Sequence, residues 1–165
     1  MTSAAIAILG FVTAQRLAEL WLSNRNTRRL LNQGAIEHGA GHYPLIVGVH
    51  AAWLAALWWW APGQPLNWPL LMLFVLLQFA RLWVIATLGA RWTTRIMTLP
   101  GAPLVRSGPY RFFNHPNYLV VIMEIAVLPL AFGLAGIALA FSILNAIVLW
   151  LRIRAEEKAL GSFRR

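Results

Sequence analysis

The sequence predicts an all-α integral membrane protein, a helical bundle with about five transmembrane helices. Hydrophobic residues make up 59% of the chain, whereas a soluble domain is about 45–50% apolar. These residues are gathered into long apolar blocks, and within lipid a helix satisfies its own backbone hydrogen bonds. The connections between the blocks alternate between basic and uncharged, as the positive-inside rule requires of a chain that crosses a membrane repeatedly.

Five apolar segments are predicted to be the spanning helices of one domain, residues 1–165. In chain order they cover about residues 3–22, 44–60, 68–88, 118–134 and 136–151. The first contains Arg16 and Glu19, so its second half is amphipathic. Pro44 suits the first turn of the second helix, because a backbone N–H would have no partner there. The third helix carries Arg81 within its apolar run.

The charges of the connections predict how these helices are oriented. Arginine is concentrated in residues 23–43, in residues 89–117 and in the tail from Arg152. Residues 61–67 and the turn near Gly133 carry no charge. Because basic connections are retained in the cytoplasm, we predict that the N-terminus lies outside. Both polar loops and the C-terminus are then cytoplasmic.

Composition excludes several kinds of site. The chain has no cysteine, so disulfides, thiolate nucleophiles and cysteine-ligated metals are excluded. The formal charge is +9, but the basic residues stand between apolar blocks, where the positive-inside rule accounts for them without a nucleic-acid partner. No other histidine or acid stands at ligand spacing from His115, so we predict no metal site.

The densest group of polar side chains is the run GPYRFFNHPNY, residues 108–118. A glycine that permits positive φ and two prolines that fix φ hold this loop in one shape. The simplest interpretation is a loop that returns the chain to the membrane. The concentration of Tyr110, Arg111, His115 and Tyr118 favours a binding site instead. For His115 the roles of general base, hydrogen-bond donor to a ligand and interfacial residue all stay open.

The last two predicted helices form a tight antiparallel hairpin, because only a residue or two around Ala135 separates them. The two cytoplasmic ends of this hairpin, near Tyr118 and Arg152, must therefore lie close together. The hairpin thus brings the polar loop beside the charged run RIRAEEK, residues 152–158. Within that run, Arg152 and Glu156 share one helix face. The alternative is a solvated helix end that carries orientation charges.

Glu124 lies about two turns into the fourth predicted helix, where an ionised carboxylate needs a partner or a polar cavity. Candidate partners are Arg81 in the third helix and Arg16 in the first. Two interpretations stay open: a buried ion pair that fixes the helix register, and one wall of a ligand cavity. His50, in the apolar run of the second helix, is predicted to bond to a neighbouring helix.

The loop motif, Glu124, the short hairpin and the run RIRAEE together resemble the isoprenylcysteine carboxyl methyltransferase family of integral membrane enzymes, especially its shorter bacterial members. The specific motifs cover about residues 85–160. The resemblance implies S-adenosylmethionine as cofactor, bound on the cytosolic side by the His-Pro-x-Tyr segment and the start of the following helix. By matching position, it implies cofactor binding by Tyr110, Arg111, His115, Pro116, Tyr118 and Glu124, and catalytic roles for Arg152, Glu156 and Glu157.

Three departures from the family pattern affect this expectation. Asn114 stands where many members have arginine, and Val120 stands where glycine is common. The sequence ends at Arg165, without the aromatic-rich tail of many members. Two expectations follow for how the cofactor pocket is closed from the cytosol: residues 23–43 cap it, or the sequence is truncated before a segment that does.

The resulting expectation is an S-adenosylmethionine-dependent O-methyltransferase of the bacterial inner membrane, with its active site facing the cytoplasm. The acceptor is expected to be lipophilic, with a carboxylate or an acidic enol, such as an alkylpyrone-type lipid or an isoprenylcysteine-like compound. Membrane lipids are the other expected partners. The alternatives are a phospholipid N-methyltransferase, a non-catalytic scaffold or transporter subunit, and a membrane reductase.

Overall fold

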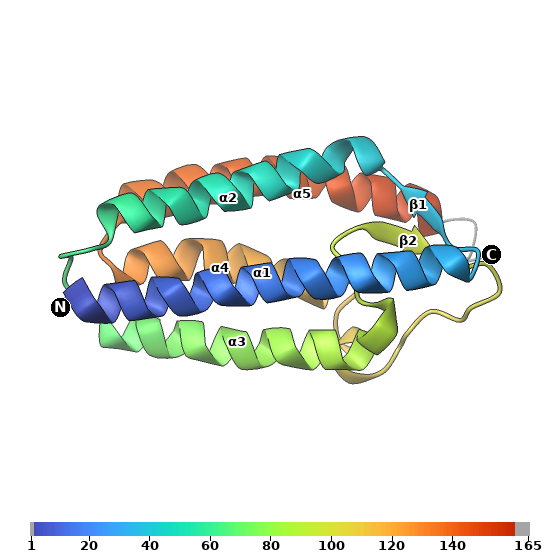
Figure 1. The fold of residues 1–165 in the computed structure, drawn as a ribbon, viewed down its shortest axis with the longest axis horizontal. Coiled ribbons are helices and arrows are strands. Elements are labelled where there is room, and N and C mark those ends of the chain that lie inside the picture. The colour runs from blue at the N-terminus through green and yellow to red at the C-terminus, as the bar shows by residue number, and fades with distance from the viewer. Residues whose placement is uncertain (1, 161–165) are drawn as a thin grey trace.

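The computed structural model describes residues 2–160, and over these residues the fold is a bundle of five α-helices that lie side by side (Figure 1). The helices are α1 (Thr2–Asn32), α2 (Tyr43–Trp60), α3 (Trp68–Leu88), α4 (Pro116–Ala131) and α5 (Ala135–Leu160). The connections contain strands β1 (Ile36–His38) and β2 (Ile96–Thr98) and the 3-10 helices η1 (Ala40–His42), η2 (Gly89–Arg91) and η3 (Gly108–Arg111). The predicted helical membrane bundle is therefore confirmed.

Two helices are longer than predicted, because their ends are helical without being apolar. Helix α1 continues to Asn32 instead of ending at residue 22. Its last turns bury Thr27, and they bury Ser23 and Asn26 against the connection after α3. The Asn26 side-chain amide donates to the backbone oxygen of Trp92 at 2.8 Å. Helix α5 likewise runs past residue 151 to Leu160. Hydropathy marks where a helix leaves lipid and does not mark where the helix ends.

Helix α4 is placed differently from its predicted span of residues 118–134. It begins at Pro116 and ends at Ala131. Its 16 residues extend about 24 Å at about 1.5 Å per residue, which is less than a hydrocarbon core of about 30 Å. By length and composition, four described helices can cross a membrane: α1, α2, α3 and α5. The five-span count stays a prediction.

A short sheet joins two connections that are far apart in sequence, and the all-α prediction missed it. Strands β1 and β2 pair antiparallel, with Glu37 opposite Met97. The Arg95 guanidinium donates to Glu37 Oε1 at 2.7 Å and lies 4.3 Å from the ring centroid of Tyr43. The sheet therefore ties the α1–α2 connection to the α3–α4 connection.

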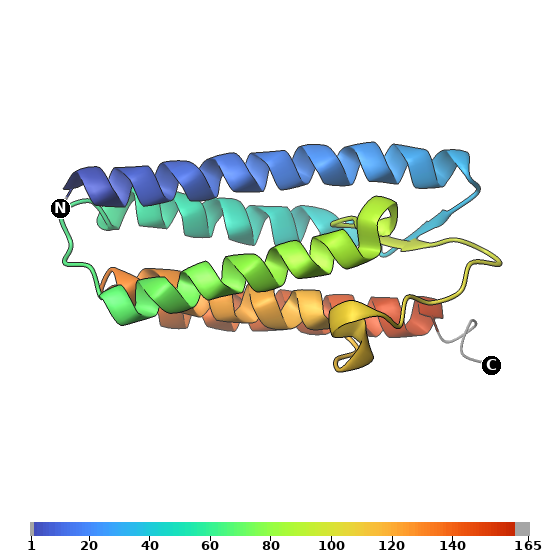
Figure 2. The same ribbon diagram turned by 90° about the horizontal axis from the view of Figure 1, so that it is seen from below.

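The connections separate into two ends of the bundle. The start of α1, residues 61–67 and the turn between α4 and α5 gather at one end (Figures 1 and 2). The sheet, the long connection from α3 to α4 and the C-terminal part of α5 gather at the other (Figures 1 and 2). The basic connections thus share one end, as the predicted topology requires. Which end faces the cytoplasm stays a prediction.

The predicted tight turn between α4 and α5 is present, but it is one residue longer and lies before Ala135, which begins α5. Only residues 132–134 separate the two helices. Gly133 adopts a left-handed φ of 70°, and the backbone N–H of Leu134 returns to the oxygen of Pro129 at 2.9 Å. This bond, and the bond from the Gly133 N–H to the oxygen of Leu130 at 2.9 Å, satisfy carbonyl groups at the end of α4. The turn therefore fixes the two helices as an antiparallel pair.

A second glycine fixes the polar loop against α3. Gly108 has a φ of 55°, and a Cβ built on it would lie 2.5 Å from Thr87 Oγ1. The loop can therefore approach α3 only because this position has no side chain. Since η3 begins at Gly108, the contact with Thr87 sets the position of Tyr110 and Arg111.

Gly108→Ala is expected to lower the free energy of unfolding by about 2–4 kcal/mol, since it combines left-handed strain with a steric clash. Gly101→Ala is the matched control, because Gly101 also has a positive φ of 76° but nothing lies within 4 Å of its added Cβ. The control should lose about 1–2 kcal/mol from strain alone. Thermal unfolding in detergent measures both, and equal losses would show that the contact with Thr87 does not constrain the loop.

Candidate active site

A cavity of about 750 Å³ lies at the basic end of the bundle. Its wall combines the end of α3, strand β2, the loop of residues 99–106, η3, the start of α4 and the end of α5. Six of the predicted site residues line it: Tyr110, Arg111, His115, Tyr118, Arg152 and Glu156. The structure thus brings most of the two sequence motifs to one cavity.

The start of α4 forms one side of this cavity. Proline disfavours the α conformation of the residue before it, and His115 is accordingly non-helical, with φ −134° and ψ 60°. Helix α4 therefore begins at Pro116, which is itself buried, and His115, Asn117 and Tyr118 line the cavity. His115 makes no capping bond with its side chain, so its ring is free to face the cavity.

Four side chains form a connected cluster between α4 and α5. Arg152 Nε donates to the Tyr118 hydroxyl at 2.9 Å, and that hydroxyl donates to Glu156. The His115 ring stacks on Tyr118 with a centroid separation of 5.3 Å and an interplanar angle of 14°. His115 Nδ1 also lies 3.7 Å from Glu156 Oε2. The predicted approach of Tyr118 to Arg152 is confirmed by these contacts.

Arg152 is a buried cation with unused donors. Its exposed fraction is 8%, and among the described residues its guanidinium hydrogen-bonds through Nε alone. The terminal nitrogens Nη1 and Nη2 therefore remain for a ligand in the cavity that Arg152 lines. A guanidinium presents such a pair of donors to a carboxylate in a planar, bidentate arrangement.

Tyr110 also faces the cavity, from η3. Burial, with a smaller contribution from the Glu156 carboxylate, raises the pKa of Tyr110 to about 12. The phenol is therefore neutral at physiological pH and can donate a hydrogen bond to a ligand.

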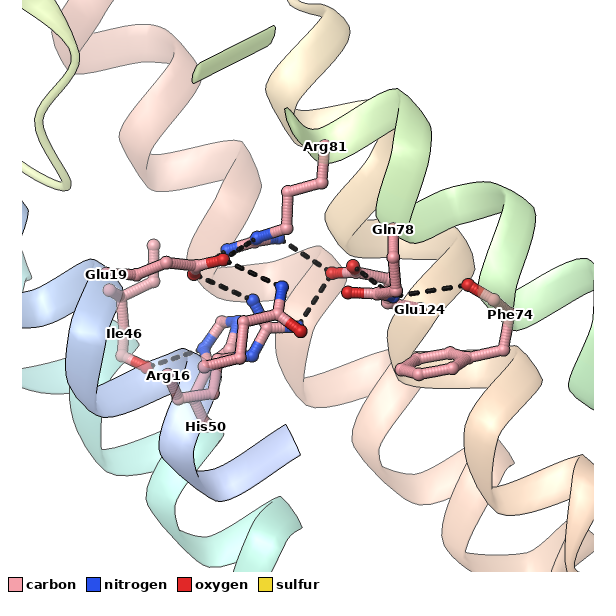
Figure 3. Close-up of polar contacts among 9 residues, drawn as sticks. Arg16, Glu19, Ile46, His50, Phe74, Gln78, Arg81 and Glu124 are labelled. Carbon is pink, nitrogen blue, oxygen red and sulfur yellow. Dashed lines mark hydrogen bonds and ion pairs between the residues drawn. The ribbon is translucent and has the colours of Figure 1, made fainter. Parts of the chain in front are cut away.

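Glu124 lies in a different place, inside an ion network between α1, α3 and α4 (Figure 3). Arg81 donates to Glu19 at 2.5 and 2.6 Å and to Glu124 at 2.7 Å. Arg16 joins the same carboxylates, at 3.0 Å to Glu19 and 2.8 Å to Glu124. Gln78 donates to the second oxygen of Glu124 at 2.9 Å. Glu124 is fully buried in this network and does not line the cavity, so the geometry supports the register-fixing interpretation.

Three other expectations differ from the structure. Glu157 is exposed and does not line the cavity, so Glu156 is the acid that faces it. Pro116 is buried behind the cavity lining, where it sets the start of α4. The prediction for His50 was wrong, because its Nδ1 bonds to the oxygen of Ile46 in its own helix at 2.8 Å (Figure 3).

Sequence reasoning missed the part of the wall that follows α3. Trp92, Ile96 and Thr98 line the cavity, and each is buried. A strand of three residues leaves too short a pattern to recognise, and Arg95 beside it was explained by orientation alone. Residues 23–43 were expected to cap the pocket. This segment contributes Leu30 to the cavity lining, whereas its strand β1 pairs with β2 and is not part of the lining.

The chain is similar to known proteins over most of its length. Residues 70–162 match the model of the isoprenylcysteine carboxyl methyltransferase (ICMT) family. The uncharacterized protein YpbQ of Bacillus subtilis is 40% identical over 161 residues, which cover 94% of this chain and 96% of that protein. An uncharacterized protein of Haemophilus influenzae is 29% identical over 159 residues, which cover 91% of each chain. No solved structure matches the chain.

Proposed function

The chain belongs to the isoprenylcysteine carboxyl methyltransferase family, and from that premise we propose that it is an S-adenosylmethionine-dependent O-methyltransferase for a lipophilic acid. The acceptor would carry a carboxylate or an acidic enol on an apolar body. Alkylpyrone-type lipids and isoprenylcysteine-like carboxylates both have this chemistry. The proposed location is the bacterial inner membrane, with the cavity on the cytoplasmic side.

The observation that carries the proposal is the state of Arg152. A buried guanidinium is stabilised by an anion, and the Glu156 carboxylate accepts from Tyr118 and not from Arg152. The free terminal donors thus favour an acceptor with an ionised oxygen. An amine acceptor would meet a positive charge at this position, so the site favours O-methylation over N-methylation of a phospholipid.

The cavity also fits the proposed cofactor. Small-molecule and cofactor sites measure about 300–1,000 Å³, and this cavity of about 750 Å³ has room for a nucleoside-sized ligand and part of an acceptor. Three buried atoms of its lining residues lack a hydrogen-bond partner: the acceptor Asn117 Oδ1 and the donors Trp92 Nε1 and Arg95 Nε. S-adenosylmethionine would supply an electrophilic methyl group on a sulfonium. The ring of Tyr110 and the charge of Glu156, which both line the cavity, are suited to hold such a cation.

The residues of the cluster have separate tasks in this proposal. Arg152 orients the acceptor oxygen and keeps it ionised. Tyr118 holds Arg152 in place by accepting from Nε, while Glu156 fixes the hydroxyl of Tyr118. An acceptor that is already ionised needs no general base, so His115 acts as a binding residue. Positioning and exclusion of water then supply most of the rate increase.

The direct test uses the full chain purified in detergent. Titration calorimetry with S-adenosylhomocysteine should show saturable binding, and a labelled methyl group should pass from S-adenosylmethionine to an extractable lipid acid. His115→Ala should weaken cofactor binding, whereas Lys158→Ala, which alters an exposed residue outside the cavity lining, should not. A flat calorimetric titration of folded protein would rule out the methyltransferase assignment.

Tyr118→Phe is expected to reduce methyl transfer by about 10- to 150-fold, because losing one hydrogen bond to a charged group is worth about 1.5–3 kcal/mol. The ring still stacks on His115, so cofactor affinity should change little. Initial rates and calorimetry measure the two effects separately. An equal loss of cofactor affinity would show that the hydroxyl binds the cofactor and does not position Arg152.

A further inference from the structure

A second hollow lies on the outer face of α1, away from the cavity. It measures about 630 Å³ and is lined by Trp21, Asn24, Arg25, Arg28, Arg29, Asn32 and Gln33. We call these residues the α1 groove. Trp21, Arg25, Arg28 and Asn32 are separated by four, three and four residues, so they lie along one face of the helix. All belong to the part of α1 near or beyond the end of the predicted first span.

The α1 groove carries positive charge without compensation. It contains three arginines and no acid. Among the described residues, none of these arginines forms an ion pair, and Arg25 makes only a contact of 5.8 Å with the ring of Trp21. The five acids of the chain do not help: four of them bond to Arg16, Arg81, Arg95 or Tyr118, and Glu157 lies on α5. No acid of the described residues pairs with these exposed arginines, so they are available to an anion from outside the bundle.

The position of the α1 groove along the helix indicates the source of that anion. A hydrocarbon core of about 30 Å takes up about 20 helical residues, so a span that starts near Ser3 leaves the core near Leu22. Trp21, which is 65% exposed, then lies at the interface, where tryptophan is enriched. Side chains on a helix lean toward its N-terminus, so Arg25 and Arg28 lean back toward the headgroup layer. Their charge, depth and direction all match lipid phosphates.

We propose that the α1 groove binds the headgroup of an anionic phospholipid, with Arg25 and Arg28 on the phosphate and Trp21 against the glycerol and upper acyl chain. This site is independent of the proposed methyl transfer. It would hold α1, which supplies Leu30 to the cavity wall, at a fixed depth in the membrane.

The test compares two double variants of the full chain that lose the same charge at the same end of the bundle. Arg25→Gln with Arg28→Gln removes charge from the α1 groove. Arg154→Gln with Lys158→Gln removes it from exposed positions on α5. Glutamine and arginine have similar helix propensities, and none of the four side chains forms an ion pair within residues 2–160, so both variants should fold. Circular dichroism confirms folding before the lipid measurements.

Native mass spectrometry then gives the affinity for the first bound phosphatidylglycerol and phosphatidylcholine. Each arginine near an anionic surface is worth about 1 kcal/mol, so the groove variant should bind phosphatidylglycerol about thirtyfold more weakly. The α5 variant should keep the affinity of the original chain, and phosphatidylcholine should bind weakly to all three proteins. Equal losses of phosphatidylglycerol affinity in both double variants would show that binding depends only on net charge, and this would overturn the proposal. Displacement of the lipid by millimolar inorganic phosphate would also overturn it, because the site would then be one for free phosphate.

Discussion

Arg152→Gln is expected to lower the rate of methyl transfer by about 10²–10³-fold, the usual effect of removing one preorganised donor that stabilises a reacting oxygen. Arg152 is buried beside the cavity, and its terminal nitrogens have no partner among the described residues. Glutamine keeps a donor to Tyr118 but removes the charge that holds an ionised acceptor. S-adenosylhomocysteine affinity should remain close to that of the original chain, because the acceptor and not the cofactor loses its partner.

Two further variants make this prediction specific. Arg152→Lys keeps the charge but loses the planar pair of donors, so it should recover only part of the rate. Arg154→Gln is the matched control, since Arg154 is exposed, lies two residues away and stacks 3.9 Å from the ring centroid of Trp150. Labelled methyl transfer into a lipid extract measures all three rates. If the Arg152→Gln rate stays within a few-fold of the original rate, Arg152 does not bind the acceptor.

Arg81→Met is expected to lower the free energy of unfolding by about 3–5 kcal/mol, as breaking a buried ion pair does. Arg81 bonds to both carboxylates of the network, and its loss leaves Glu19 and Glu124 to share Arg16. Glu124 is fully buried, so water cannot replace the missing partner. Thermal unfolding in detergent measures the loss, and Lys158→Met, at an exposed position, should leave stability nearly unchanged.

A double variant separates the network from simple loss of packing. Arg81→Met with Glu124→Leu removes opposite charges together and leaves the pair of Arg16 and Glu19, which bond at 3.0 Å. The double variant should therefore be less destabilised than the sum of the two single changes. Strict additivity would mean that Arg81 and Glu124 do not interact, and the ion network would then lose its role in fixing helices α1, α3 and α4.

The sequence predicted those parts of the fold that depend on local patterns. The apolar runs located the membrane-facing parts of the helices, and the turn at residues 132–134 was short enough to place Tyr118 beside Arg152. The partners of Glu124 were also predictable, because few cations lie within the apolar segments and a buried carboxylate needs one.

The remaining features depend on contacts between segments that lie far apart in sequence. Ser23, Asn26 and Thr27 look solvent-exposed by composition, yet each is buried. The pairing of β1 with β2 joins residues about sixty positions apart, and strands of three residues show no periodicity. Glu156 lines the cavity and Glu157 does not, because of how α5 is rotated about its axis. The spacing of the charges in the sequence does not fix that rotation.

The shortness of α4 has a kinetic consequence for an enzyme of this kind. A helix of 16 residues is about 24 Å long, so it cannot reach both faces of a bilayer whose core is about 30 Å thick. If the tight turn to α5 lies at one membrane surface, the first residues of α4 lie beneath the opposite surface, and the cavity begins at these residues. A lipid acid could therefore reach Arg152 by lateral diffusion, without leaving the bilayer. Saturation of the enzyme would then depend on the mole fraction of acceptor among the lipids. Diluting the membrane with inert phospholipid would therefore slow turnover, even at a constant total amount of acceptor.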